Sequence, residues 1–463
     1  MPSQTSRARP LRAADFELLA EGGFGDPYNN RAQALAWFDE HLYVGVSRQG
    51  QGGAHKLPAG RRAGRGPGAE WQRRQRVQRG QIWRFDGLDW EPVAESPLVA
   101  ERGDRAARES GYRRMVVFQG DGDEEPVLYV STISARGGLI LRSQDGYTFE
   151  PTAHQPDVPG RPWSYRALAS FEGRLYAAPA GQVTDDGVQR NAAGAAVVYA
   201  ASDPAGGAWV EACDPGFGDP ANGTVYELSV AGDHLYAGTF NPVTGCQVWR
   251  TAGGRLPHRW TQVIADGGGR GPTNEAASSI CAFAGAVFVG TGQEANQGDD
   301  GPRRPRVGGE VLRLDDDGSV SVVVGDRRRT GSRWRAAASG LGPGFGSDAN
   351  GVVWEMAAHE GCLYAGTEDR VALNAALARP GGGRSRTAAA GDDDREPGFD
   401  LWCTPDGVDW SPVTTVGFGS PHLFGLESMC STPWGLFVGT VAVPVWPWTD
   451  PSASRGCEVW RGM

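Results

Sequence analysis

The stretch YELSVAGDHLYAG at residues 226–238 decides the fold, because its pattern returns along the whole chain. It joins an alternating apolar run, a short polar turn, and a second apolar run that ends in Leu-Tyr or Val-Phe and usually a glycine. Alternation with a period of two is typical of β-strands, so each copy predicts a hairpin. Further copies lie at residues 354–366 and 426–439 and, more loosely, at 33–45, 113–132, 166–178 and 275–290.

Two more short runs follow most copies. The third run carries a tryptophan, as in QVWR (247–250), EVWR (458–461), QIW (81–83) and DLW (400–402). The fourth begins with one, as in WTQV (260–263), WSPV (410–413) and WEPV (90–93). Four short strands per repeat indicate an all-β fold, a β-propeller. We predict seven blades at about residues 31–97, 111–152, 164–213, 225–266, 275–326, 352–415 and 424–463.

The last repeat ends after its third run, and the missing fourth run lies at the other end of the chain. Residues 16–19 (FELL) are followed by GGFGDPYNN, which resembles the segments after other fourth runs at 214–223, 342–351 and 416–421. We therefore predict that residues 16–19 complete the last blade and close one domain, residues 1–463. Closure removes the exposed sheet edge that promotes aggregation.

The composition of the chain limits which partners and which cellular compartment we expect. The formal net charge of −10 argues against general affinity for nucleic acid. The chain has no apolar stretch long enough for a membrane span and no apolar core of a secretory signal, so we expect a cytoplasmic protein. The seven scattered cysteines read as buried hydrophobes in a reducing compartment. Lys56 is the single lysine, which indicates a high-GC bacterial genome and argues against Schiff-base chemistry.

Long connections gather on one face. In a propeller the second-to-third-strand connections share a face, and here they are long at residues 47–79, 293–308, 368–398 and 441–455. We predict flexible inserts at 47–79 and 369–398. The first insert is rich in arginine, which suits either a flexible tract or a grip on RNA or an acidic partner. Because function concentrates on decorated loops of a rigid scaffold, we place the binding pocket on this face.

Turns between the third and fourth runs carry a family resemblance. SQDGYTF (143–149), TPDGVDW (404–410) and, less fully, FDGLDW (85–90) resemble the Asp-box, or BNR, repeat of sialidase-like propellers. The resemblance implies a structural hairpin in which the aspartate ties the turn and the aromatic residue packs between sheets, away from the active face. The arginines and the Tyr-Glu pair of sialidases have no identified counterpart here.

The starts of the innermost strands supply the main candidate site. Arginine and tyrosine at the channel mouth form a clamp for an anion or a leaving group, and nearby carboxylates supply a base. The alternative is that arginines and glutamates line the wet channel and satisfy one another. The clamp and catalytic candidates are Arg113, Arg166, Tyr112, Tyr165, Glu227 and Glu355.

Further ligand-binding candidates are Trp446 and Trp448, His422 and Glu427. The two indoles lie among prolines and form either a platform for a sugar, aromatic or alkyl group, or a lid on their own scaffold. Aspartates and asparagines of the GFGDPxN loops could bind Ca²⁺ or cap their own turns. We predict no metal site and no cofactor, with Ca²⁺ as the one alternative.

Two functions follow from one pocket. The first is binding of a small molecule, glycan or peptide. The second is an enzyme for alkyl or group transfer or glycan hydrolysis in bacterial secondary metabolism. In architecture and residue types the chain resembles the propeller domain of cylindrocyclophane-type aryl-alkylating enzymes, which implies arginine and tyrosine at a leaving halide and a carboxylate base. An enzyme predicts unpaired arginines and a carboxylate of raised pKa, whereas a binding module predicts paired arginines and an exposed aromatic patch.

Overall fold

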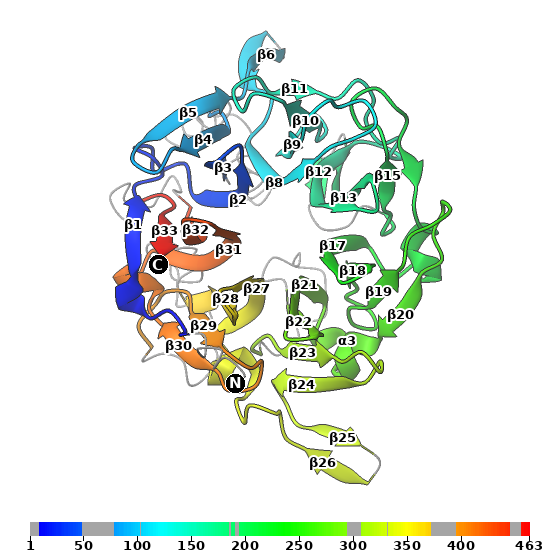
Figure 1. The fold of residues 1–463 in the computed structure, drawn as a ribbon, viewed down its shortest axis with the longest axis vertical. Coiled ribbons are helices and arrows are strands. Elements are labelled where there is room, and N and C mark those ends of the chain that lie inside the picture. Colours follow the sequence, from blue (N-terminus) through cyan, green and yellow to red (C-terminus); the bar gives the residue numbers. More distant parts are fainter. Residues whose placement is uncertain are drawn as a thin grey trace, which may run out of the picture.

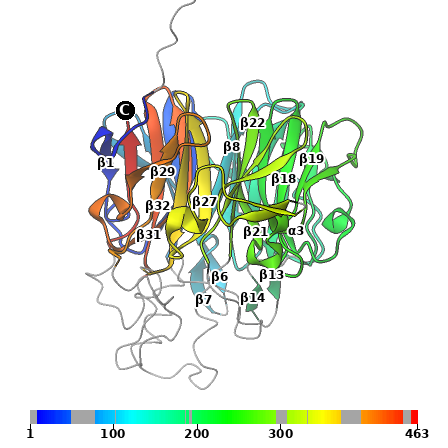
Figure 2. The ribbon, with the colours of Figure 1, turned by 90° about the horizontal axis from the view of Figure 1, so that it is seen from below.

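The chain folds into a β-propeller. In the computed structural model, small antiparallel sheets are arranged as a ring around a central opening (Figure 1), and the edge-on view shows a thick disc (Figure 2). The described residues are 9–48, 78–101, 103–184, 187–189, 194–293, 307–330, 332–371, 395–444 and 455–463. Trp446 and Trp448, and most of the predicted inserts, lie outside these residues.

Each blade is an antiparallel meander whose first strand faces the central opening (Figure 1). The blades in the first half of the chain are β2 (Arg31–Phe38), β3 (His41–Ser47), β4 (Gln81–Phe85) and β5 (Trp90–Glu95); then β8 (Gly111–Phe118), β9 (Val127–Ile133), β10 (Ile140–Ser143) and β11 (Glu150–Pro151); then β12 (Pro162–Phe171), β13 (Arg174–Thr184), β15 (Tyr199–Ala201) and β16 (Val210–Glu211).

The remaining blades follow the same order. They are β17 (Thr224–Ala231), β18 (His234–Phe240), β19 (Val248–Thr251) and β20 (Thr261–Ile264); then β21 (Ala276–Phe283), β22 (Ala286–Gly292), β23 (Val311–Leu314) and β24 (Val320–Val324); then β27 (Asn350–His359), β28 (Cys362–Asp369), β29 (Leu401–Thr404) and β30 (Ser411–Thr414); and finally β31 (Leu423–Thr432), β32 (Gly435–Ala442) and β33 (Val459–Gly462).

The first strand of the chain pairs with the last. As the sequence predicted for residues 16–19, β1 (Phe16–Ala20) runs antiparallel to β33, with Phe16 opposite Gly462 and Leu18 opposite Trp460. Arg461 reinforces the pairing, because its Nε donates to Glu17 Oε1 at 2.6 Å. The C-terminal strand is therefore covered on its outer edge.

Short extra elements lie outside the blade pattern. The sequence did not predict the hairpins β6 (Leu98–Glu101)–β7 (Asp104–Ala107) and β25 (Arg328–Thr330)–β26 (Arg333–Arg335), or the strand β14 (Gly187–Gln189). In Figure 2, β6, β7 and β14 extend from one face of the disc. The helical turns are η1 (Ala13–Asp15), η3 (Pro215–Gly218), α3 (Asp266–Gly269), η4 (Gly271–Thr273), η5 (Pro343–Gly346) and η6 (Gly417–Gly419).

The second strand of each blade forms the core. Its Leu-Tyr or Val-Phe pair places one side chain on each face of the sheet, and both faces are covered by neighbouring blades. The aliphatic members are all buried: Leu42, Leu128, Leu175, Leu235, Val287, Leu363 and Leu436. Burial on both faces explains why these strands are apolar throughout rather than alternating.

A Gly-Phe-Gly loop follows several blades and packs against their outer strands. Its phenylalanine has a positive φ and stacks on the third-strand tryptophan, with centroids 4.7–5.3 Å apart. A positive φ costs a non-glycine residue about 1–2 kcal/mol, which the buried stacking offsets. The stacked pairs are Phe24 on Trp83, Phe217 on Trp249, Phe345 on Trp402, and Phe418 on Trp460.

Asparagine completes this loop. Asn222 Nδ2 donates to Gly216 O at 2.9 Å and to Gln247 Oε1 at 2.8 Å, and Asn29 and Asn350 make the equivalent pairs of bonds. Two loop aspartates cap their own turns, since Asp219 Oδ1 accepts from Ala221 N at 2.9 Å and Asp26 Oδ1 accepts from Tyr28 N at 3.0 Å. These contacts give the motif a structural role. Among the described residues, no group of three or more His, Cys, Asp and Glu side chains is placed to hold a metal ion.

The turns that resemble Asp-boxes share one geometry. Asp145 Oδ1 accepts from Tyr147 N at 2.8 Å and Thr148 N at 2.7 Å, and Asp86 and Asp406 each accept from two backbone N–H groups in the same way. Each of these turns joins the third strand of a blade to its fourth. All seven cysteines are free, and burial raises the pKa of Cys246 to about 12. None of the helices in the described part of the chain combines the length and apolarity needed to span a membrane.

Candidate functional site

The innermost strand of every blade contains a register shift at the same level. In β8 the shift falls between Tyr112 and Arg114, and in β12 between Tyr165 and Ala167. A β-bulge leaves one residue unpaired and re-aims its side chain, and bulges are common beside active sites. The residues skipped by the shifts are Gln33, Arg113, Arg166, Tyr226, Ser278, Trp354 and Glu427.

These bulged residues converge on the propeller axis. With Arg114, six of them line one central pocket: Gln33, Arg113, Arg166, Ser278, Trp354 and Glu427. The free space among them is about 10 Å³, roughly the room that one water molecule requires. Side chains therefore fill the axis, and a larger ligand has to lie above them or displace them.

Arg114 holds two carboxylates from other blades. Its Nη1 donates to Glu355 Oε2 at 3.2 Å, and its Nη2 donates to Glu227 Oε2. Burial raises the pKa of both glutamates, against the opposing effect of Arg114. Burial alone would lower the pKa of Arg114, but the two carboxylates outweigh it and raise the pKa. Because β8, β17 and β27 supply one group each, this cluster ties three blades across the axis.

Glu427 forms a second polar cluster. Its Oε2 accepts from Arg31 Nη1 at 2.6 Å and its Oε1 from Gln33 Nε2 at 2.9 Å. The Arg31 guanidinium also lies 5.4 Å from the ring centroid of Trp354. The Trp354 ring packs closely over Gly425, where a side chain would collide with it. One edge of the pocket is therefore aromatic and one acidic.

Arg113 and Arg166 occupy the remaining side. Arg113 Nη1 donates to Ser164 Oγ at 2.7 Å, and Arg166 lies 3.4 Å from the ring centroid of Tyr226. Arg113 is buried and takes part in no ion pair with another described residue. Burial, and then the neighbouring charge of Arg166, lowers the pKa of Arg113 to about 9. Arg113 is thus a cation with one hydroxyl partner.

Several predicted site residues lie elsewhere. Tyr112 and Tyr165 precede the bulges and pack into apolar clusters between blades, so they do not line the pocket as predicted. Burial raises the pKa of both. His422 lies beside the loop of the last blade, with Nε2 3.5 Å from Glu458 Oε1. Burial, and then Arg455, lowers its pKa to about 4, so it is neutral at physiological pH.

The sequence analysis missed part of the site. It named Arg113 but not Arg114, which binds both carboxylates, and it overlooked Gln33 and Ser278. Strict alternation predicts that only one of two adjacent arginines faces the channel, but the bulge turns both toward it. The signal that was available is the doubled arginine itself, in GYRRM at residues 111–115.

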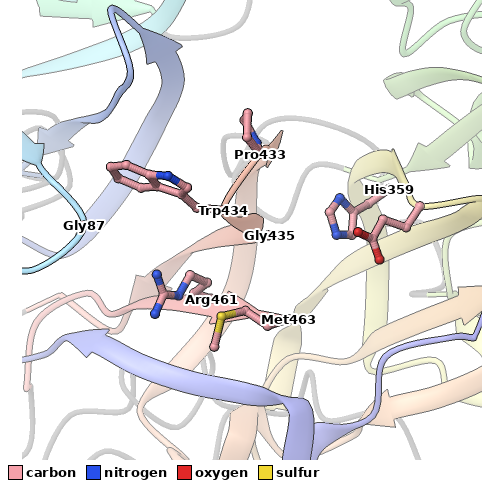
Figure 3. A pocket seen from close by; sticks show the side chains of 8 residues that line it. Gly87, His359, Pro433, Trp434, Gly435, Arg461 and Met463 are labelled. Atoms are coloured by element: carbon pink, nitrogen blue, oxygen red, sulfur yellow. The ribbon is translucent and has the colours of Figure 1, made fainter.

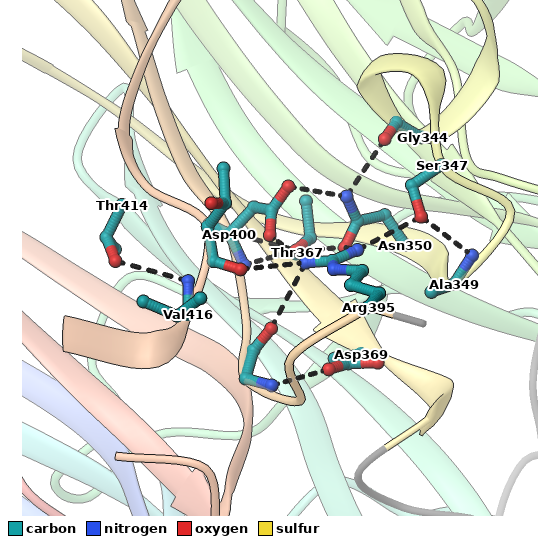
Figure 4. A network of polar contacts seen from close by, with 12 residues as sticks. Gly344, Ser347, Ala349, Asn350, Thr367, Asp369, Arg395, Asp400, Thr414 and Val416 are labelled. Atoms are coloured by element: carbon teal, nitrogen blue, oxygen red, sulfur yellow. Dashed lines mark hydrogen bonds and ion pairs between the residues drawn. The ribbon is translucent and has the colours of Figure 1, made fainter. Parts of the chain in front are cut away.

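Arginines fix the chain next to the predicted inserts. Arg370 Nη2 donates to Gln293 O at 2.9 Å and its Nη1 to Val307 O at 3.2 Å. Arg395 reaches Asp400 and also donates to Ser347 Oγ at 3.0 Å, as Figure 4 shows. Burial raises the pKa of Asp400, and Arg395 opposes this. The described edges of the loop-bearing face are therefore held by charge-assisted bonds.

A larger cavity lies on the opposite face, among the tight turns. It measures about 490 Å³ and includes Trp434, His359, Arg461 and Met463 in its lining (Figure 3). Two of its polar groups already have partners, since His359 Nδ1 lies 2.9 Å from Ser431 Oγ and Arg461 bonds to Glu17. Burial lowers the pKa of His359.

Comparison with known proteins gives architecture only. No family model and no curated protein matches the chain. Similar solved structures include an α-L-arabinofuranosidase from Fusarium graminearum, with 11% identity over 74% of this chain and 88% of that one at a TM-score of 0.38. A puromycin-hydrolysing peptidase from Mycobacterium tuberculosis has 10% identity over 94% of this chain and 53% of that one at a TM-score of 0.45. Structural similarity at this level does not indicate which substrate this chain binds or which reaction it catalyses.

Proposed function

We propose that this chain is one seven-bladed propeller of the Asp-box type, closed by β1, that binds a small molecule with an anionic group on its loop-bearing face. The anion would bind at Arg113, beside Arg166. The observation that carries the proposal is the buried Arg113 guanidinium, whose only described polar partner is Ser164.

Charge compensation supports this assignment. The carboxylates of Glu227 and Glu355 bind Arg114, and that of Glu427 binds Arg31. Burying a cation without a counter-charge costs several kcal/mol, so an incoming anion gains what Arg113 lacks. A guanidinium offers a planar fork of donors that matches a carboxylate, sulfate or phosphate.

The rest of the pocket favours a ligand with a flat or ring-shaped body. Trp354 is half-buried at the pocket edge, and its ring can pack against a sugar or an aromatic ring. Gln33 and Ser278 add neutral polar groups. We therefore propose an acidic sugar, an acidic glycan end or an aromatic acid as the ligand class.

Calorimetric titration of matched ligands tests this proposal. Uronic-acid oligosaccharides and aryl carboxylates are compared with their neutral counterparts on the native protein and on Arg113→Met. Charged hydrogen bonds of this kind contribute about 1.5–3 kcal/mol, so Arg113→Met weakens the acidic ligands about 10- to 100-fold. The exposed Arg161→Met serves as the control. Equal binding of neutral and acidic ligands would contradict the proposal.

A second candidate function is catalysis at the same pocket, favoured by the raised pKa of Glu355 and Glu227. A buried carboxyl that keeps its proton toward neutral pH suits general acid chemistry. Aryl glycosides and alkyl halides test glycan hydrolysis and alkyl transfer. Turnover that disappears in Glu355→Gln, while binding of the acidic ligand persists, supports an enzyme; absence of turnover with both classes refutes these two reactions.

A further inference from the structure

A basic hairpin projects from the rim of the ring, away from the central pocket (Figure 1). It consists of β25 and β26, which form a separate two-stranded sheet between the fifth and sixth blades. The segment DRRRTGSRWR at residues 326–335 places five arginines within nine residues, in a chain whose net charge is −10. This local charge opposes the charge of the whole molecule.

The root of the hairpin is firmly attached. Arg328 Nη2 donates to the fully buried Glu310 at 2.5 Å, and its Nε donates to Gly268 O at 3.1 Å. Asp326 pairs with Arg270 at 2.8 Å. The root therefore rests on the neighbouring blade, and the projecting part starts from a fixed base.

The two faces of the hairpin differ. Arg329 lies opposite Trp334 on one face, and Arg328 lies opposite Arg335 on the other. Trp334 is 63% exposed, and the guanidinium of Arg327 lies 5.5 Å from its ring centroid. An exposed indole flanked by arginines is a stacking platform.

We propose that the β25–β26 hairpin binds single-stranded nucleic acid. Alternate residues of β26 face opposite sides, so the bound strand crosses the edge of the hairpin: a base stacks on Trp334 on one face, and Arg333 and Arg335 contact phosphates on the other. Every base has a flat π-face, whereas the acidic side chains of a protein segment cannot stack on an indole, so Trp334 favours nucleic acid over an acidic peptide. Because the phosphate contacts are electrostatic, this binding falls steeply as the salt concentration rises.

Fluorescence anisotropy with a labelled dT20 oligonucleotide tests the proposal. Trp334→Ala removes the stacking and weakens binding about 5- to 100-fold. Arg333→Gln/Arg335→Gln also weakens binding and reduces the slope of log K against log salt by about 1.4, which corresponds to two phosphate contacts. The exposed pair Arg255→Gln/Arg259→Gln, in the connection between β19 and β20, leaves both quantities unchanged.

Three results would overturn this assignment. They are no binding of dT20 at low salt, equal weakening by the Arg255/Arg259 control, or displacement of the oligonucleotide by poly-L-glutamate as efficiently as by unlabelled dT20 with no effect of Trp334→Ala. The last result would mean that an acidic protein segment is the partner. Because the hairpin is exposed and separate from the blades, unchanged thermal unfolding shows that a variant remains folded.

Discussion

Two parts of this molecule repeat around the ring, and they repeat in different ways. In the Gly-Phe-Gly loops both geometry and chemistry return, since each phenylalanine stacks on a tryptophan. In the innermost strands the bulge returns in each blade, yet the bulged residue is in turn an amide, a cation, a phenol, a hydroxyl, an indole or a carboxylate.

The difference separates architecture from specificity. A position that holds the blades together needs the same contact each time, so its residue type is fixed within the repeat. A position that only has to reach the axis keeps its backbone geometry, but its residue type is free to differ from blade to blade. We infer that the bulges are a common scaffold on which this chain has built one particular pocket around Arg113, Trp354 and Glu427.

The largest effect is expected in the loops. Phe345→Ala removes a buried ring that stacks on Trp402 and meets the edge of Trp410, which lowers the free energy of unfolding by about 3–5 kcal/mol. Denaturant unfolding measures it, and the exposed Tyr147→Ala is the control. Ligand affinity of the folded Phe345→Ala protein stays unchanged. A loss below about 1 kcal/mol would contradict the structural role of the loop.

Arg114 and Arg113 are adjacent in the sequence, but replacing each of them is expected to change the stability of the protein by a different amount. At a pH where both glutamates are ionised, Arg114→Met leaves them without this counter-charge and costs about 2–4 kcal/mol, somewhat below the value for a fully buried pair because 13–23% of the three side chains is exposed. Arg113→Met removes a poorly compensated cation at similar volume and changes stability by less than about 1 kcal/mol. Equal destabilisation by the two variants, measured in urea, would refute the distinction.

The carboxyl of Glu355 gives the channel a pH dependence. Its folded-state pKa is raised above the usual 4.5, chiefly by burial. The stability linked to its proton is therefore fully present below about pH 4.5 and is lost as pH rises through the folded-state pKa. Glu355→Gln cannot ionise, so its unfolding midpoint declines less than that of the native protein from about pH 5 to about pH 8. Parallel pH profiles of the two proteins would exclude this role.

The smallest effect is expected in the tight turns. Asp145→Ala removes bonds to two backbone N–H groups in an exposed turn and lowers stability by about 1 kcal/mol or less. Hydrogen bonds from those groups lower the pKa of Asp145 to about 2, so its contribution persists until the pH falls toward that value. Thermal unfolding of Asp145→Ala and of Asp145→Asn near neutral pH measures this loss of stability. A loss comparable to that of Phe345→Ala would show that the turn does more than fix a hairpin.

The sequence predicted the parts of this molecule that depend on short-range patterns. Repeated alternation gave the strands, and the segment at residues 16–19 gave the pairing of β1 with β33. The same repeated alternation led us to place Glu227, Glu355 and Glu427 at the axis. Tyr112 and Tyr165 were placed wrongly because a one-residue bulge changes which neighbour faces the channel, and period-two alternation alone does not reveal a bulge. One partner of Arg114, Glu355, lies 241 positions away in the sequence, and only the folded arrangement of the blades brings the two together.

Anomalous scattering from a crystal grown in selenate tests the central claim most directly. The selenate ion is a stand-in for the acidic group of the ligand. The account predicts a selenium peak within hydrogen-bonding distance of the Arg113 guanidinium, with Arg114 still bound to Glu227 and Glu355. An empty pocket in which Arg113 binds Glu427 in place of Arg31 would contradict it.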